Sequence, residues 1–127
     1  MEEFPLNQSV DLWVVPAPES NPWTPLIDWR LGFWHSRAML GSRQSLKWDP
    51  VKPLLMATPA GLASPRILFW PENLESQFDF DRLVHVVAKL KTKSALFLVG
   101  QGKSVEKIES WMHLVQIPEL DLKVHTL

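Results

Sequence analysis

The chain contains no cysteine and no tyrosine, and only five of its 127 residues are glycine. The absence of thiols excludes disulfides, cysteine nucleophiles and zinc sites with cysteine ligands. No apolar run approaches the ~20 residues that cross a bilayer. The acidic start, Met1–Pro5, lacks the basic and apolar regions of a secretory signal. We therefore expect a cytoplasmic protein without a membrane-spanning segment.

Neither sign of charge is in large excess, since the formal net charge is −1. This balance does not favour a polyanionic or polycationic partner for the whole molecule. With 46% hydrophobic residues, the chain is large enough for one domain with a buried core. Five of the seven tryptophans and most of the prolines come before Pro65. Within the single domain (1–127) we therefore separate an acidic, proline-rich tail (1–22), a Trp/Pro-rich segment (23–64) and a regular unit (65–127).

Five segments after Pro65 alternate between the apolar pattern of a buried strand and that of an amphipathic helix. They are Arg66–Trp70, Phe80–Lys91, Ala95–Val99, Val105–Gln116 and Leu122–Leu127. This βαβαβ order predicts an α/β fold with a small, mostly parallel sheet and crossover helices. Leu54–Thr58 has the pattern of a further strand, and we expect the Pro/Trp-rich N-terminal half to pack on the sheet.

Local signals indicate where these elements begin and which way they face. Asp79 or Asp81 supplies a carboxylate at the start of the first helix, and Ser104 is the predicted N-cap of the second. Apolar residues recur at helical spacing in both helices, so each presents one face to the core. The last strand alternates apolar and polar residues, which places it at the sheet edge with Lys123 and His125 facing outward.

The strongest chemical motif is Gly100-Gln-Gly102-Lys103-Ser104, between a buried strand and a helix. A nucleotide phosphate loop reads G-x-x-x-x-G-K-[ST], and its first glycine would fall at Phe97, within the strand. The loop before Lys103 is therefore too short to encircle a triphosphate. The favoured interpretation is a tight strand-to-helix turn, in which the glycines give backbone freedom and Ser104 caps the helix. The alternative is that the amides of Gly102–Val105, with Lys103, bind a single phosphate or carboxylate.

Catalytic and metal sites are not indicated elsewhere. The four histidines are far apart and show no metal-ligand spacing; His85 and His113 lie off the apolar faces of the helices. The acidic group after the first strand of the regular unit is most simply the set of carboxylates at a helix start; it comprises Glu72, Glu75, Asp79 and Asp81. The sequence thus predicts no catalytic residue, no metal and no cofactor.

The N-terminal half suggests a contact surface. Pro25–Leu40 is a predicted helix with two apolar stripes, whereas a surface helix needs one. Tryptophan and arginine are enriched at interface hot spots. The expected partner-binding residues are Trp23, Trp29, Arg30, Phe33, Trp34, Arg37, Arg43 and Trp48. Burial of these tryptophans in the core is the competing interpretation, and the sequence leaves both open.

These features predict a non-enzymatic protein-protein interaction module, an accessory or regulatory subunit that docks on another protein or on a second copy of itself. The alternative partner is nucleic acid, because residues 30–52 carry five basic residues and one acid among their tryptophans. The alternation of strands and helices also resembles truncated RecA-like proteins without a phosphate loop, which implies a replication or repair accessory role. A third hypothesis is a small phosphate-ligand-binding domain using Gly100–Ser104.

Overall fold

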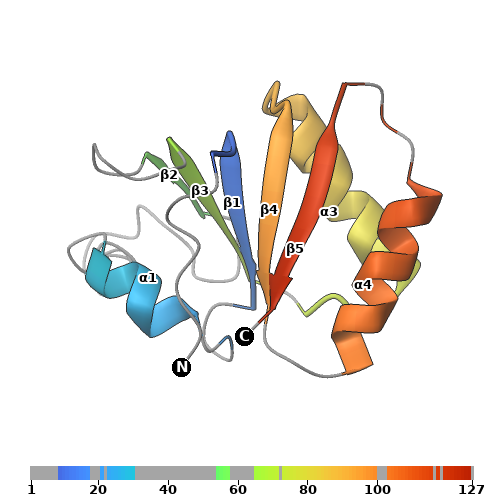
Figure 1. Ribbon diagram of the computed structural model, residues 1–127, viewed down its shortest axis with the longest axis horizontal. Coiled ribbons are helices and arrows are strands. Elements are labelled where there is room, and N and C mark those ends of the chain that lie inside the picture. Colours follow the sequence, from blue (N-terminus) through green and yellow to red (C-terminus); the bar gives the residue numbers. More distant parts are fainter. Residues whose placement is uncertain are drawn as a thin grey trace.

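The computed structural model describes residues 9–17, 21, 23–30, 54–57, 65–71, 73–99, 103–115, 117 and 119–126. The elements in chain order are β1 (Leu12–Pro16), α1 (Thr24–Arg30), β2 (Leu54–Ala57), β3 (Arg66–Trp70), α3 (Gln77–Lys89), β4 (Ser94–Val99), α4 (Lys103–Leu114) and β5 (Asp121–Thr126). The five strands form one sheet in the order β2-β3-β1-β4-β5 (Figure 1).

The sheet is mostly parallel, as the sequence predicts. The central strand β1 pairs in parallel with β3 on one side and with β4 on the other, and β5 continues the parallel pairing beyond β4. Of the strands described, β2 alone runs antiparallel to its neighbour, which is β3. The α/β fold class is therefore confirmed. No helix in the described part of the chain is long and apolar enough to span a membrane.

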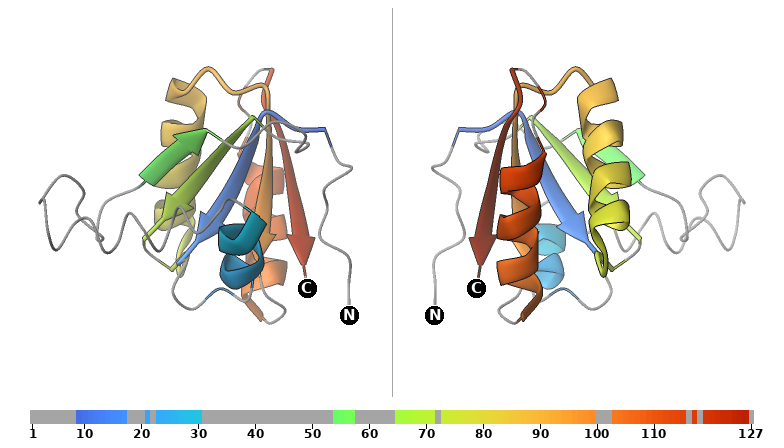
Figure 2. Two further views of the ribbon diagram at one scale, coloured as in Figure 1. Left: turned by 90° about the vertical axis from the view of Figure 1, so that its left-hand side faces the viewer. Right: turned by 90° about the vertical axis from the view of Figure 1, so that its right-hand side faces the viewer.

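Helices cover both faces of the sheet (Figure 2). Helices α3 and α4 lie on one face and α1 on the other. Alternate residues of β1 enter the two cores: Leu12 and Val14 pack on the α3 side, and Trp13 and Val15 on the α1 side. All five residues of β1 are buried because both faces of a parallel sheet are covered.

The structure corrects the assignment of residues 1–22 to a tail. Leu12–Pro16 is the central strand, with parallel neighbours on both sides. Its sequence, LWVVP, is a continuous apolar run of the kind that buried strands show. The run ends in proline within a proline-rich stretch, which favoured a tail. Pro16 stands at the strand's end, where a missing N–H is tolerated.

Helix α3 begins earlier than predicted and uses a different cap. Ser76 is the N-cap, and its Oγ accepts a hydrogen bond from the Asp79 amide at 3.2 Å. The Asp79 carboxylate in turn accepts from the Glu75 amide at 3.3 Å. The predicted apolar face is confirmed, since Phe80 and Leu83 are completely buried. In α4, Ser104 lies inside the first turn, so its prediction as N-cap is wrong.

Helix α1 starts close to the predicted position. The Ile27 amide donates to the Trp23 carbonyl at 3.0 Å, so Trp23 occupies the N-cap position. The structure describes this helix as Thr24–Arg30, and the remainder of the predicted range, 31–40, lies outside the described residues. Ile27 is fully buried against the sheet, whereas Trp29 is 58% exposed.

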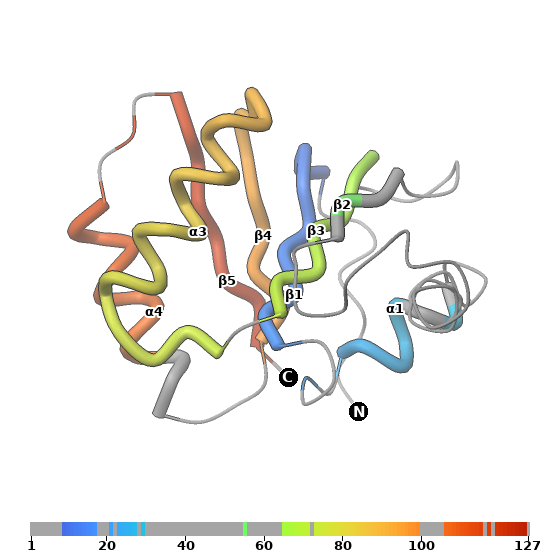
Figure 3. The backbone as a smooth tube through the Cα atoms, turned by 180° about the vertical axis from the view of Figure 1, so that it is seen from behind, coloured from blue at the N-terminus to red at the C-terminus, as the bar shows by residue number. Residues whose placement is uncertain are grey.

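Strand β5 forms one edge of the sheet, as expected. Lys123 is exposed, but the prediction that His125 faces solvent is wrong. The His125 ring lies 5.4 Å from the Trp23 ring, centroid to centroid, and is half-buried by it. Figure 3, seen from behind, shows how the last strand and the start of α1 approach the same end of the sheet.

Candidate functional site

The topology directs attention to the carboxyl ends of β1 and β4. After β1 the chain crosses to the face covered by α1, whereas β3 and β4 lead into α3 and α4 on the opposite face. The connection after β1 and those after β3 and β4 therefore diverge to opposite faces of the sheet at the carboxyl end of the central strand. In open α/β sheets, ligands bind in the crevice that such a divergence creates at the carboxyl ends of the strands.

Asn21 links the two strands at this point. Its buried side-chain amide donates to the carbonyl of Pro16 at 3.1 Å and to that of Leu98 at 2.7 Å. The side-chain oxygen accepts from the Trp23 amide at 2.9 Å. One side chain thus joins the end of β1, the end of β4 and the start of α1. Both N–H groups of the amide and one lone pair of its oxygen are used, so we assign Asn21 the role of positioning the strand ends.

Ala17, directly after β1, has an unusual backbone conformation. Its φ angle is 45°, in the left-handed region that residues other than glycine seldom occupy. The Ala17 amide donates to the Trp70 carbonyl at 2.6 Å, which ties the exit of β1 to the end of β3. Such a conformation costs on the order of 1 kcal/mol and persists only where neighbouring contacts impose it. Residues held in this way cluster at ligand-binding loops.

Several buried polar atoms near the carboxyl ends of the strands lack a hydrogen-bond partner. The buried atoms without a hydrogen-bond partner among the residues described include Oγ1 of Thr24, Nε1 of Trp70 and Nε2 of His125. Thr24 begins α1, Trp70 ends β3 and His125 lies near the end of β5. Buried polar atoms are nearly always hydrogen-bonded, so these atoms call for a partner beyond the residues described: another part of the chain, a water or a ligand.

The predicted anion-binding segment reaches this edge as well. Gly100 and Gly102 lie outside the described residues, but β4 ends at Val99 and α4 begins at Lys103. Lys103 and Ser104 therefore stand in the first turn of a 12-residue helix that begins four residues after the strand whose end Asn21 contacts. The first amides of a helix and its dipole favour an anion. Anion binding here stays a prediction.

Three of the eight predicted partner-binding residues lie in the described part of the chain, at the start and in the last turn of α1. Trp23 is buried, with 1% of its surface exposed, and Trp29 is exposed. Arg30 ends α1. The other five lie outside the described residues: Phe33, Trp34, Arg37, Arg43 and Trp48. Burial of Trp13 and Trp23 in the core removes part of the excess aromatic surface on which the docking hypothesis depended.

The remaining polar candidates have structural positions. His85 and His113 are exposed on their helices, as predicted. Glu75 is exposed and Asp79 lies in the first turn of α3, which agrees with carboxylates at a helix start, while Glu72 lies outside the described residues. Among the residues that the structure describes, no group of three or more His, Asp or Glu side chains is placed to hold a metal ion.

Sequence reasoning missed Asn21, Ala17 and the contact of His125 with Trp23. Asn21 and Ala17 fell within the presumed tail. Recognition of Leu12–Pro16 as a strand would have placed both residues in the loop after its carboxyl end, where site residues are expected. The ring contact between Trp23 and His125 joins residues far apart in the chain, and no local pattern signals it.

No protein-family model matches the sequence, and no curated protein is similar to it in sequence. Solved structures do share the fold. The macrodomain of Mycobacterium tuberculosis DarG superposes with a TM-score of 0.66 at 11% identity, covering 98% of this chain and 93% of that one. The macrodomain of Thermus aquaticus DarG gives 0.63 at 11%, covering 98% and 94%. A tomato leucine aminopeptidase mutant, K354E, gives 0.63 at 10%, covering all of this chain and 31% of that one.

These likenesses show that the chain folds as macrodomains do. They also contradict the prediction of a non-enzymatic protein-protein interaction module, since the structures of this shape are macrodomains and part of an aminopeptidase. The RecA-like resemblance and the accessory role that it implied are replaced by the macrodomain likeness. Association with another protein or with nucleic acid is not tested by these comparisons and stays a prediction. The chain is thus an α/β domain with the fold of a macrodomain.

Proposed function

We propose that this domain binds a small, phosphate-bearing ligand at the carboxyl ends of β1 and β4. ADP-ribose is the ligand to test first, because the structural neighbours that cover almost the whole chain are macrodomains. Fold alone does not transfer a function. The proposal therefore depends on the site, and the observation that carries it is the bracing of the two strand ends by Asn21.

Rigid placement of the strand ends supports binding. A ligand site loses less entropy on binding when its walls are already fixed. Asn21 holds the exits of β1 and β4 together through two hydrogen bonds to carbonyls, and the Ala17 amide holds the exit of β1 to β3. The carboxyl ends of three neighbouring strands, β3, β1 and β4, are therefore held together by hydrogen bonds in the absence of a ligand.

The start of α4 supplies the proposed recognition of phosphate. The amides of the first turn of a helix have no carbonyl partners within the helix, so they are free to bind an anion. The positive end of the helix dipole and the charge of Lys103 have the sign that a phosphate requires. Ser104 adds a hydroxyl group to the same turn. This assignment rests on the position of α4 after β4 and on the residue types.

The apolar and polar groups beside the phosphate position suit a nucleotide or sugar. Thr24 and His125 each have a polar atom without a hydrogen-bond partner in the described structure, and they lie at the α1 side of the same edge. The side chain of His125 is held against Trp23. We propose that a hydroxyl group of the ligand forms hydrogen bonds with these atoms, and that small side-chain movements give the ligand access to them.

We propose binding without turnover as the working hypothesis, since the fold likeness extends to domains of different kinds and does not specify a reaction. Incubation of the protein with ADP-ribosylated substrate, followed by product analysis, decides this point. A cytoplasmic location is likewise a prediction from the sequence.

Isothermal titration calorimetry tests the binding proposal. We expect ADP-ribose to bind, and Lys103→Ala to weaken binding by roughly tenfold or more, the effect of losing one charge-assisted hydrogen bond. Lys107→Ala, one turn further along α4 and exposed, is the matched control and should bind like wild type. Circular dichroism confirms that each variant is folded. Absence of heat with ADP-ribose, ADP and inorganic phosphate at millimolar concentration would refute the proposal.

A further inference from the structure

A second surface lies away from the proposed ligand site, along the outer edge of β5. In the described part of the chain, β4 is the only strand that pairs with β5, so the other side of β5 forms an open sheet edge. Figure 2 (right) shows β5 at the border of the sheet with α4 alongside. A groove of about 430 Å³ runs between the two elements, lined by Glu109, Met112, His113, Leu122, Lys123 and Val124.

The hydrogen-bonding pattern of β5 determines which residues turn their backbone N–H and C=O groups toward the open edge of the sheet. The Asp121 amide donates to the Lys93 carbonyl at 2.8 Å, so the backbone groups of Asp121 point toward β4. In a parallel ladder, alternate residues pair with the neighbouring strand. Lys123 and His125 therefore also direct their backbone groups to β4, whereas Leu122 and Val124 direct theirs to the open edge.

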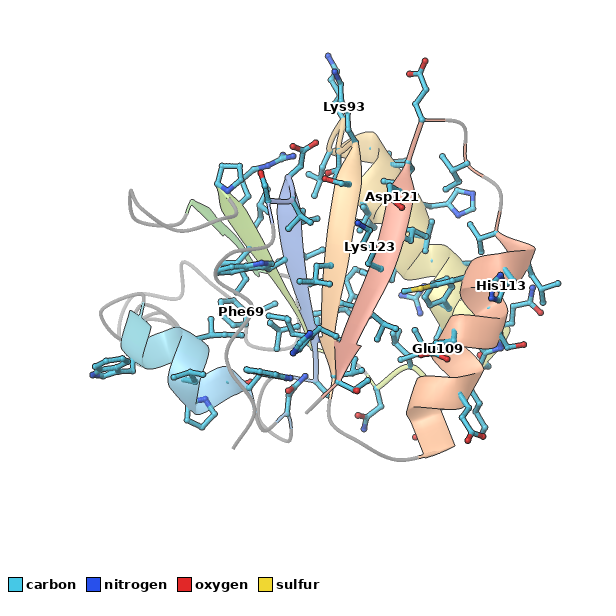
Figure 4. The ribbon with its side chains drawn as sticks, viewed as in Figure 1. Phe69, Lys93, Glu109, His113, Asp121 and Lys123 are labelled. Atoms are coloured by element: carbon cyan, nitrogen blue, oxygen red, sulfur yellow. The ribbon has the colours of Figure 1, made fainter. Side chains whose placement is uncertain are left out.

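The side chains of β5 alternate in the other direction, between the two faces of the sheet. Leu122 and Val124 pack with α3 and α4 against the core, and Leu120 before the strand does the same. Asp121 and Lys123 stand on the opposite face, about 60% exposed, with 3.6 Å between the Asp121 carboxylate and the Lys123 ammonium. Figure 4 shows these two side chains next to one another along β5.

The resulting sequence, Leu120-Asp-Leu-Lys-Val124, is complementary to itself when two copies run antiparallel. With Leu122 opposite its own copy, Asp121 of one chain lies opposite Lys123 of the other, twice across the two-fold axis. Leu120 then lies opposite Val124 on the core face. The outward backbone groups of Leu122 meet in a hydrogen-bonded pair, which puts the charged residues at non-hydrogen-bonded positions, where opposite side chains are closest.

Neighbouring registers are worse. Centring the pair one residue earlier puts Asp121 opposite Asp121, and one residue later puts Lys123 opposite Lys123; like charges directly opposite are destabilising. Centring it on Val124 puts Lys123 opposite His125. A lysine alone on an edge strand discourages pairing. Because Asp121 lies two residues from Lys123, the edge can pair with a second copy of itself in one register, while the registers on either side of it place like charges opposite one another.

We propose that two copies of this chain associate through β5, antiparallel and centred on Leu122, to form a continuous ten-stranded sheet. The self-complementary charges are the observation that selects a second copy as the occupant of this edge. The neighbouring strand would cover the groove between α4 and β5 in both copies, as an isologous two-fold interface requires. The interface is small, so the dimer is expected to dissociate on dilution.

Sedimentation equilibrium over a wide range of concentration tests the proposal, because a dimer has twice the 14.6 kDa mass of the chain. We expect a monomer–dimer equilibrium for wild type. Asp121→Lys and Lys123→Asp each place like charges opposite one another at two positions, and each should weaken self-association by about tenfold. Lys107→Asp changes the net charge by the same amount as Lys123→Asp but lies on α4, and it should dimerise like wild type.

A mixture of the two β5 variants supplies the decisive comparison. The lysine introduced at position 121 of the first variant would face the aspartate introduced at position 123 of the second, so the mixture should form a heterodimer with an affinity near that of wild type. A mixture of Asp121→Lys with Lys107→Asp should form a weaker heterodimer, because one of its two cross-strand charge pairs joins two lysines. The proposal is overturned if wild type stays monomeric up to millimolar concentration. It is also overturned if dimerisation is indifferent to both single variants, or if the mixture fails to restore it.

Discussion

Replacement of Asn21 by alanine tests the brace at the carboxyl ends of β1 and β4. The change removes two hydrogen bonds to the carbonyls of Pro16 and Leu98 and one from the Trp23 amide, all of them buried. A buried group left without its partner costs about 1–3 kcal/mol. Since relaxation and water recover part of three such losses, we expect the free energy of unfolding to fall by about 3–4 kcal/mol.

Urea denaturation followed by tryptophan fluorescence measures this change. With a slope of about 1–3 kcal/mol/M for a protein of this size, the midpoint should fall by more than about 1 M. Asn21→Asp keeps the acceptor for the Trp23 amide but points a carboxylate oxygen at two carbonyls, so it should be no better than alanine. Gln77→Ala, on the exposed start of α3, is the matched control and should change stability by less than ~0.5 kcal/mol. A loss below ~1 kcal/mol for Asn21→Ala would refute the role assigned to this residue.

Three further substitutions follow from the structure, each measured by thermal or urea unfolding. Ala17→Gly should leave the domain as stable as wild type or stabilise it by up to about 1 kcal/mol, because glycine accepts the positive φ angle without strain; a clear loss would contradict the strain. Ser76→Ala should cost about 1 kcal/mol through loss of the α3 cap, whereas Ser110→Ala, exposed within α4, should not, and equal effects would argue against capping. Phe80→Ala should cost about 3–5 kcal/mol because the ring fills the core, while Phe78→Ala, 69% exposed, should be nearly neutral; similar losses would contradict the burial.

The fold of the C-terminal half was predictable because its signals are local. Buried strands such as Ser94–Val99 are continuous apolar runs, and the apolar positions of α3 repeat at helical spacing, so each element is indicated by its own residues. The predictions of the helix N-caps were less accurate. Ser76 precedes the start of the predicted helix at Phe80, and carboxylates further on offered an equally good start.

The central strand was the main error in the fold. Leu12–Pro16 carries the same apolar signal as β3 and β4, but it is short and lies among prolines. Its identity as a strand depends on pairing with Ile67–Trp70 and Ala95–Phe97, which come much later in the chain. Nothing local in residues 1–22 reveals that pairing.

The site could be predicted only in part, for the same reason. Gly100–Ser104 was recognisable as an anion-binding candidate from its residues and its position between strand and helix, and its role stays a prediction. Asn21 was not, because its bond to the Leu98 carbonyl spans 77 positions in the sequence. The conformation of Ala17 is likewise imposed by contacts with β3 and not by its own preference. Residues that act by joining distant strands leave no signal in the local sequence.

The central claim is that a ligand binds where β1 and β4 end, and titration of ¹⁵N-labelled protein with ADP-ribose, followed by amide chemical shifts, tests it most directly. The account predicts shifts concentrated at Ala17, at Asn21 and in the first turn of α4. Shifts confined to the opposite end of the sheet, around Lys93 and Glu119, or no shifts at saturating ligand, would contradict it.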